Sequence, residues 1–123
     1  MKLLLFDLDG TLLDNDKNIS QRTLETLEAC RAKGMLIGVS TSRSEQNSLT
    51  FLSGLNPDIL ISSGGALVKR GCEYIYTAEM SPQETREMID TARKICGEDC
   101  EITIDTLTDH DWNYKSVKLQ MLS

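Results

Sequence analysis

The fold of this chain is decided by the stretch Leu3-Leu4-Leu5-Phe6-Asp7-Leu8-Asp9-Gly10-Thr11-Leu12-Leu13. An apolar run leads directly into two acidic residues, and Gly10 then lets the backbone turn sharply. A short apolar run bounded by glycine is typical of a strand buried in a parallel sheet. In open α/β sheets, ligands bind beyond the carboxyl ends of the strands. We therefore expect a buried first strand with Asp7 and Asp9 at its ligand-binding end.

Two carboxylates at such a position can do chemistry together. One can attack an electrophile while the other transfers protons. Asp7 and Asp9 can also contribute to a Mg²⁺ site, because this ion prefers oxygen ligands and neutralises charge in phosphoryl transfer. The alternative is a solvated turn, since Asp and Gly are common turn residues. The residues 14–18 that follow are also turn formers and predict a small loop over this strand end.

The motif Asp7-Leu8-Asp9-Gly10-Thr11-Leu12 resembles the first motif of the haloacid dehalogenase (HAD) superfamily, most of whose members are phosphatases. The resemblance implies that Asp7 is the nucleophile and forms an aspartyl-phosphate, and that Asp9 is the general acid/base. It also implies that Gly10 and Thr11 support the motif. Mg²⁺ is then expected between enzyme and phosphate, held in part by Asp7 and Asp9.

A second polar cluster, residues 40–44, follows the apolar stretch 35–39. Hydroxyls, an arginine and helix-N-terminal amides at a strand end suit an anion. Simple N-capping of the next helix by one of the serines explains the same residues without a ligand. The superfamily's second motif is a Thr or Ser here, often followed by Gly-Arg. The resemblance thus implies phosphate binding by Thr41, Ser42 and Arg43, with Ser42 in place of the usual Gly; Arg43 could equally brace the loop.

Strands and helices alternate in the first half of the chain. Apolar strands are expected at residues 35–39 and 59–61 in addition to the first one. Ser20 is a good N-cap for one intervening helix, and Glu45–Leu52 predicts another with Leu49 and Leu52 facing inward. This alternation predicts an α/β fold with a doubly wound parallel sheet and right-handed crossovers.

The order of elements then changes. The residues on either side of Gly71 predict a β-hairpin. Ser81-Pro82-Gln83-Glu84 predicts a helix start, with an N-cap serine, a proline at the first helical position and a glutamate three residues after the cap. We therefore expect a core domain at 1–78 and a second α/β unit at 79–123.

Residues Gly64-Gly65-Ala66 resemble the Asn-Gly-Ala of the Cof-like sugar phosphatase branch of the superfamily, with Gly64 replacing Asn. That branch inserts an α/β cap domain where our second unit begins, and such a cap selects the substrate. The resemblance implies that 1–78 is an incomplete Rossmann-like core and 79–123 part of a cap. The family's later motifs are a Lys and a pair of acids that completes the Mg²⁺ site. They have no match in this chain, which we expect to hold only the front portion of the architecture.

Composition limits the partners. A net charge of −6 argues against nucleic acid or an anionic membrane as the main partner. No signal-peptide pattern and no membrane-spanning stretch is recognised, so we expect a cytoplasmic protein. The 4 cysteines are irregularly spaced and predict free, mostly buried thiols.

The sequence as a whole predicts a Mg²⁺-dependent phosphomonoester hydrolase that acts on a small phosphorylated metabolite, such as a sugar phosphate. Two other classes stay open. One is a catalytically incomplete phosphate-binding or interaction module. The other is a phosphoacceptor signalling domain, which also carries acids after its first strand but is disfavoured by the hairpin and helix after Ala66. The incomplete sheet is expected to expose an apolar edge and face, which favours self-association.

Overall fold

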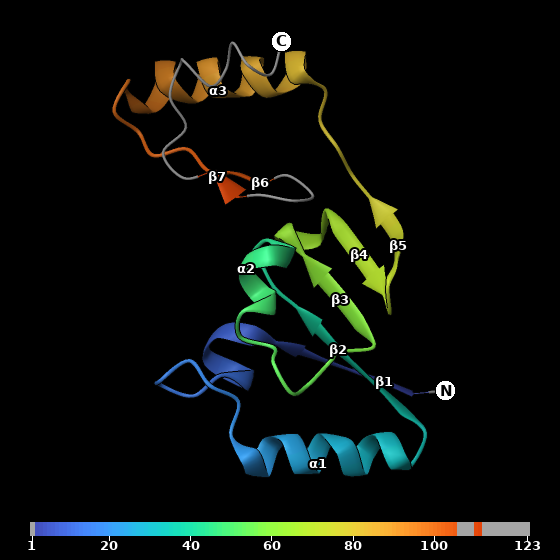
Figure 1. Ribbon diagram of the computed structural model, residues 1–123. Helices are drawn as coiled ribbons and strands as arrows, with labels where there is room; N and C mark the ends of the chain where they lie inside the picture. The colour runs from blue at the N-terminus through green and yellow to red at the C-terminus, as the bar shows by residue number, and fades with distance from the viewer. Residues whose placement is uncertain (1, 106–109, 112–123) are drawn as a thin grey trace. The chain divides into compact units, whose positions relative to one another are not determined.

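The first of two compact units, Met1–Thr77 and Ala78–Ser123, is built on a five-stranded sheet (Figure 1). The computed structural model describes residues 2–105 and 110–111. The strands are β1 (Lys2–Asp7), β2 (Met35–Ser40), β3 (Ile59–Ser62), β4 (Leu67–Arg70) and β5 (Glu73–Thr77), and they lie in that order. β1, β2 and β3 run parallel, whereas β4 and β5 are antiparallel to their neighbours. The predicted α/β fold is confirmed, with three parallel strands followed by a hairpin.

Two helices connect the parallel strands. α1 (Gln21–Ala32) begins after the predicted N-cap Ser20, while α2 (Glu45–Leu49) is shorter than expected. The prediction that Leu49 faces inward is wrong, because its side chain is 49% exposed. The same prediction for Leu52 is confirmed: the chain turns after Leu49, and Leu52 lies in the core, where it is 3% exposed.

The apolar core lies on one face of the sheet. Side chains alternate along a strand, so Ile37 and Val39 point to the same face, and both are fully buried. Right-handed crossovers place the connecting helices on that same face. The buried members of this core are Leu8, Leu12, Leu13, Leu27, Ile37, Val39, Leu52, Leu55 and Leu60.

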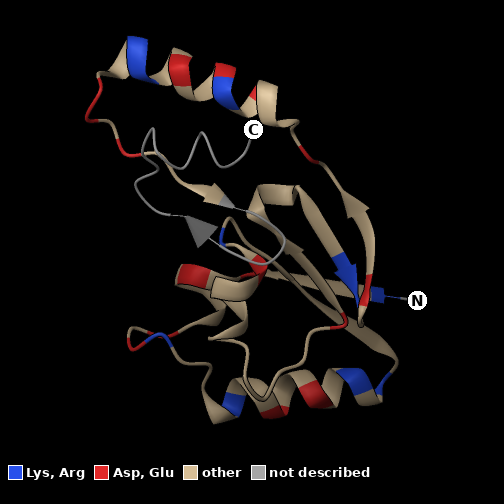
Figure 2. Ribbon diagram, turned by 45° about the horizontal axis from the view of Figure 1, so that its top comes forward, with Lys and Arg blue, Asp and Glu red and all other residues tan. Residues whose placement is uncertain are grey.

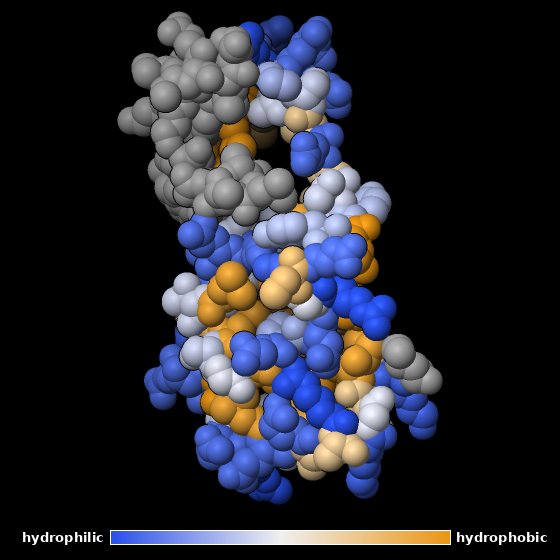
Figure 3. Space-filling view, turned by 45° about the vertical axis from the view of Figure 1, so that its right-hand side comes forward, coloured by the Kyte–Doolittle hydropathy of each residue, from blue (hydrophilic) through white to orange (hydrophobic). Residues whose placement is uncertain are grey.

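The opposite face of the sheet is open along β1. Leu3 and Leu5 are 44% and 46% exposed, so the prediction of a fully buried first strand is wrong. β1 is an edge of the sheet, and the connecting helices of the first unit lie on its other face. Here Leu5 lies over Gly38, where an added Cβ would come within 2.7 Å of the leucine Cδ1. We call Leu3, Leu5, Gly38 and Ile59 the open face. Figure 3 shows that the first unit carries apolar residues at its surface.

A pair of charged residues links α1 to the edge of the sheet where β3 begins. The Asp58 carboxylate accepts hydrogen bonds from the Ile37 amide at 2.8 Å and from Arg31 Nε at 3.3 Å. The Asp58 backbone donates to Ile37 O at 2.7 Å and accepts from the Gly71 amide at 3.0 Å. Arg31 also donates to Leu55 O at 2.8 Å. One aspartate thus joins a helix, two strands and a hairpin.

A buried acid holds α2 against the hairpin. Glu45 is 7% exposed, and its two carboxylate oxygens accept from Lys69 Nζ at 2.9 Å and from the Tyr74 hydroxyl at 2.8 Å. Lys69 Nζ also lies 5.2 Å from the centroid of the Tyr74 ring. The hydrogen bond to the Glu45 carboxylate raises the pKa of Lys69 and that of Tyr74. The Glu45 contacts therefore fix the start of α2 relative to β4 and β5.

The second unit contains α3 (Pro82–Cys96), β6 (Ile104–Asp105) and β7 (His110–Asp111), with the two strands antiparallel. α3 starts at the predicted N-cap Ser81, whose hydroxyl accepts from the Glu84 amide at 3.1 Å, and Gly97 follows its last residue. Its assignment as a cap domain stays a prediction, and part of 79–123 lies outside the described residues. No helix in the described ranges is long and apolar enough to cross a bilayer.

The cysteines differ from expectation in their burial. All four are free thiols, but Cys72 and Cys96 are exposed, and Cys30 and Cys100 are half-buried. The expectation of mostly buried thiols is therefore wrong, because Cys72 lies at the turn of the β4–β5 hairpin and Cys96 is the last residue of α3.

Candidate active site

Asp7 ends β1 and lies beside Ser40, the last residue of β2, in the register of the sheet. The two parallel strands therefore deliver their following residues to one edge. Asp7 Oδ1 accepts a hydrogen bond from the Leu8 amide at 2.8 Å. The Asp7 side chain is exposed, so it can meet a ligand from solvent.

A single wide helical turn, Leu8–Leu12, follows β1 and presents Asp9. The Leu13 amide closes this turn by donating to Leu8 O at 3.0 Å. Gly10 has φ +76°, a left-handed conformation that glycine adopts without strain. Leu8 and Leu12 point into the core. This apolar anchoring leaves Asp9 at the surface.

Two cationic side chains bind the Asp9 carboxylate. Arg43 Nε donates to Oδ2 at 2.7 Å, and Arg43 Nη2 donates to Oδ1 at 2.9 Å. Lys17 Nζ donates to Oδ1 at 3.0 Å. The hydrogen bonds from Arg43, and next those from Lys17, hold the pKa of Asp9 well below its ordinary value. In this arrangement Asp9 is ionised, and it must leave these cations before it can act as a general acid.

The Arg43 guanidinium has two further contacts besides Asp9. Its Nη1 donates to Asn47 Oδ1, and its guanidinium lies 4.6 Å from the centroid of the Phe51 ring. A stacked, bidentate arginine of this kind has little freedom to move. Arg43 therefore couples Asp9 to α2 and to the residues that follow it.

Lys17 reaches Asp9 from the predicted loop over the strand end, which carries acidic and basic residues together (Figure 2). Asp14 Oδ1 accepts from the amides of Asp16 at 2.9 Å and Asn18 at 3.0 Å. The Lys17 amide donates to Asp14 O at 3.0 Å, and Lys17 adopts φ 62°. The backbone of this turn is thus bonded internally, whereas the Lys17 side chain is 53% exposed. Nothing in the sequence pattern singles out Lys17, since a lysine among turn formers is ordinary.

The loop that carries Thr41 is bonded to the segment after β3. The Thr41 amide donates to Ile61 O at 2.9 Å, and the Gly64 amide donates to Thr41 O at 3.2 Å. Thr41 is 5% exposed, and its Oγ1 accepts from the Arg43 amide at 3.1 Å. The Arg43 amide is therefore engaged within the loop. The Thr41 hydroxyl keeps its own hydrogen to donate.

The predicted site residues are brought together only in part. Asp9 and Arg43 are bonded directly, and Thr41 is bonded to Arg43. No hydrogen bond among the described residues joins Ser42 or Thr11 to this group, and both are exposed. The N-capping interpretation holds for another serine of the loop, Ser44, whose hydroxyl accepts from the Asn47 amide at 3.2 Å. The roles assigned to these residues remain predictions.

The described residues do not form a complete Mg²⁺ site. They contain no cluster of three His, Cys, Asp or Glu side chains that could hold a metal. Both Asp9 carboxylate oxygens bind cations, which leaves the Asp7 carboxylate and the Asp9 carbonyl as oxygen donors. Mg²⁺ requires near-octahedral oxygen coordination, so these two groups supply only part of it.

Comparison with known proteins gives one family. A family model described as haloacid dehalogenase-like hydrolase matches residues 4–120. Two curated Bacillus subtilis proteins named 5-amino-6-(5-phospho-D-ribitylamino)uracil phosphatase are similar in sequence. YitU is 44% identical over 49 residues, covering 40% of this chain and 18% of its own length. YwtE is 28% identical over 90 residues, covering 73% of this chain and 32% of its own. The chain thus spans about a third or less of these curated relatives.

Solved structures agree on the fold. A haloacid dehalogenase-like hydrolase from B. subtilis aligns with a TM-score of 0.77 at 21% identity, over 99% of this chain and 42% of that one. BT4131, described as a HAD subclass IIB sugar phosphatase, aligns with a TM-score of 0.72 at 31% identity, over 89% of this chain and 43% of that one.

Proposed function

This chain belongs to the haloacid dehalogenase-like hydrolase family, and we propose that its protein hydrolyses a small phosphorylated metabolite, such as a sugar phosphate. The observation that carries the proposal is the placement of Asp7 and the Thr41 loop at the carboxyl ends of neighbouring parallel strands. That edge is where ligands bind in open α/β sheets. The names of BT4131 and YitU support a small phosphorylated substrate.

The proposed reaction has two displacements. An Asp7 carboxylate oxygen attacks phosphorus, the bond to the leaving oxygen breaks, and Asp9 gives that oxygen a proton. Water then attacks the aspartyl-phosphate, Asp9 takes a proton from it, and phosphate leaves with Asp7 restored. Thr41 and Arg43 are proposed to hold the phosphoryl oxygens through hydrogen bonds from the hydroxyl and guanidinium.

Mg²⁺ is the proposed cofactor, and Asp7 and Asp9 are the residues proposed to contribute to its binding. When bound, it would offset the repulsion between the anionic nucleophile and the anionic phosphoryl group. The proposal also includes a cytoplasmic location, a small-molecule substrate and no nucleic-acid or membrane partner. The net charge of −6 supports the last point.

Substitution of Asp7 tests the proposal. The whole protein should release phosphate from p-nitrophenyl phosphate and from a panel of phosphorylated sugars, and Asp7→Asn should abolish this release. Asp16→Asn, an exposed acid of the 14–18 turn, is the matched control and should keep activity. Mass spectrometry of acid-quenched enzyme should find a phosphoryl group on the peptide that contains Asp7. Retained turnover in Asp7→Asn would remove Asp7 from the role of nucleophile.

A further inference from the structure

Two cationic side chains already bind Asp9, two residues after the proposed nucleophile Asp7. Among the described residues, Lys17 and Arg43 are the cationic side chains that contact Asp9, through three hydrogen bonds of 2.7, 2.9 and 3.0 Å. Both positive charges are thus paired with the Asp9 carboxylate. An incoming phosphate anion would therefore compete with the Asp9 carboxylate for these two cations.

We propose that Lys17 is a binding residue for the phosphoryl anion, together with Arg43, and that the Asp9 carboxylate occupies their donors until the anion arrives. This inference rests on the proposed function, because it takes the phosphoryl group to bind beside Asp7. A carboxylate and a phosphate both present a pair of anionic oxygens to a guanidinium. The exchange therefore replaces one anion by another and frees Asp9 to reach the leaving oxygen.

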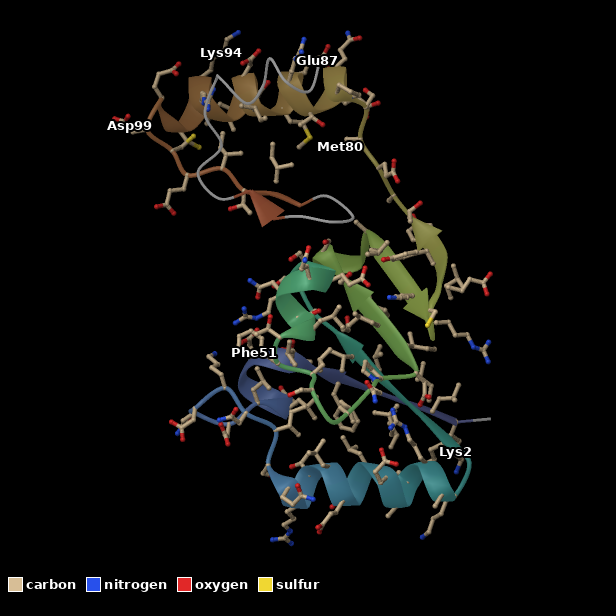
Figure 4. All side chains as sticks on the ribbon, viewed as in Figure 1. Lys2, Phe51, Met80, Glu87, Lys94 and Asp99 are labelled. Carbon is tan, nitrogen blue, oxygen red and sulfur yellow. The ribbon has the colours of Figure 1, made fainter. Side chains whose placement is uncertain are left out.

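The contacts indicate which cation moves. Arg43 is fixed by Asn47 and by the Phe51 ring, and Figure 4 shows Phe51 at the end of α2, beside the turn that follows β1. Lys17 has its backbone amide hydrogen-bonded within the turn, but its side chain is long and half-exposed. That side chain also borders a hollow of about 320 Å³, whose other walls include Ile19 and Thr50. The exposed Lys17 side chain has space beside it, so we assign the movement to Lys17 and keep Arg43 in place.

Competition between Asp9 and phosphate gives a direct test on the 123-residue chain. Asp9→Asn removes the internal competitor and should tighten binding of inorganic phosphate roughly threefold to tenfold, as expected for one partly exposed charge-assisted contact. Lys17→Met should weaken binding by a similar factor. The decisive comparison adds Lys17→Met to Asp9→Asn. A lysine that contacts the anion still matters there, whereas a lysine that only pairs with Asp9 does not.

The measurement is calorimetric titration with inorganic phosphate in metal-free buffer at fixed ionic strength. Lys33→Met, which removes the same charge at the end of α1, is the control and should leave the affinity unchanged within a factor of about two, because exposed distant charges are screened. In the wild-type chain, NMR should show a phosphate-induced shift of the Lys17 ε-methylene signals. This NMR measurement uses only the wild-type chain, so it remains informative even if the substituted chains do not fold.

The outcomes separate this inference from the proposed function. Equal phosphate affinity of Asp9→Asn with and without Lys17→Met, and an unmoved Lys17 signal, would overturn the inference. If Thr41→Val abolished binding in that case, the proposed phosphate site would stand. A wild-type chain and an Asp9→Asn chain that both fail to bind phosphate would overturn this inference, whereas the proposed function is tested separately by Asp7→Asn in the whole protein.

Discussion

Removing the buried carboxylate of Glu45 should destabilise the first unit far more than removing an exposed one. Glu45→Ala leaves Lys69 and the Tyr74 hydroxyl without their acceptor in a place where Glu45 is 7% exposed and the Lys69 side chain 24%. Breaking a fully buried ion pair costs about 3–5 kcal/mol. Because Lys69 retains some contact with water, we expect a loss of about 2–3 kcal/mol in the free energy of unfolding.

The assay is urea unfolding followed by circular dichroism, with Glu28→Ala as the matched control. Glu28 also pairs with an arginine, at 2.6 Å, but its side chain is 59% exposed, so its loss should cost less than about 0.5 kcal/mol. Replacing both charged partners, as in Glu45→Leu with Lys69→Met, should recover most of the lost stability. A Glu45→Ala loss no larger than that of Glu28→Ala would refute the role given to this cluster.

The pH dependence of the Glu45 cluster has a definite sign. The folded-state pKa of Lys69 is raised above 10.5, so its stabilising effect is complete below that pH and is lost as pH rises through the folded value. The stability difference between wild type and Glu45→Ala should therefore shrink above a pH of about 10.5. The pKa of Tyr74, followed by tyrosinate absorbance, should fall in the variant, since the Glu45 hydrogen bond is what raises it.

Three further predictions concern Asp9, the open face and Mg²⁺. Asp9 has a lowered pKa, so its pairing stabilises the fold at pH above 3.8, and this stabilisation is lost as pH falls through the folded value. In urea unfolding at a series of pH values, Arg43→Met should therefore reduce the loss of unfolding free energy at acid pH by about 1 kcal/mol, and an unchanged loss would contradict this. The open face should drive concentration-dependent self-association, and Leu5→Lys should reduce it in sedimentation velocity, whereas Lys2→Met should not. The 123-residue chain should bind Mg²⁺ weakly and turn over roughly four to six powers of ten more slowly than a complete family enzyme, if two electrostatic groups worth ~3–4 kcal/mol each are lacking; micromolar Mg²⁺ affinity with brisk phosphate release would be the contrary result.

Local patterns predicted the order of elements well. Ser20 and Ser81 were identifiable as helix caps because a hydroxyl before an amphipathic stretch satisfies free amides. The apolar stretches 35–39 and 59–61 predicted parallel strands because short apolar runs between helical segments are typical of this kind of sheet. These features are decided by residues close together in sequence, which is why they could be read from it.

Features that depend on distant residues could not be predicted in this way. The exposure of Leu5 depends on what packs beside β1, which its own apolar run does not reveal. The capture of Asp9 by Lys17 and Arg43 depends on the geometry of two loops, 8 and 34 positions away along the chain. The motif predicts that Asp9 transfers protons, whereas its hydrogen-bond partners are visible only in the structure.

The contacts of Arg31 and Asp58 should make one part of the first unit open less often than the 14–18 turn. Asp58 binds the amide of Ile37, and its backbone is bonded to Ile37 and Gly71, so these groups must open together. Their amide protons should therefore exchange with solvent among the slowest of the chain, through sub-global opening. The amides of the 14–18 turn lie outside this unit of opening and should exchange through local fluctuations. The edge that carries Asp9 can then rearrange around an arriving anion while the pairing of the strands beneath it stays in place.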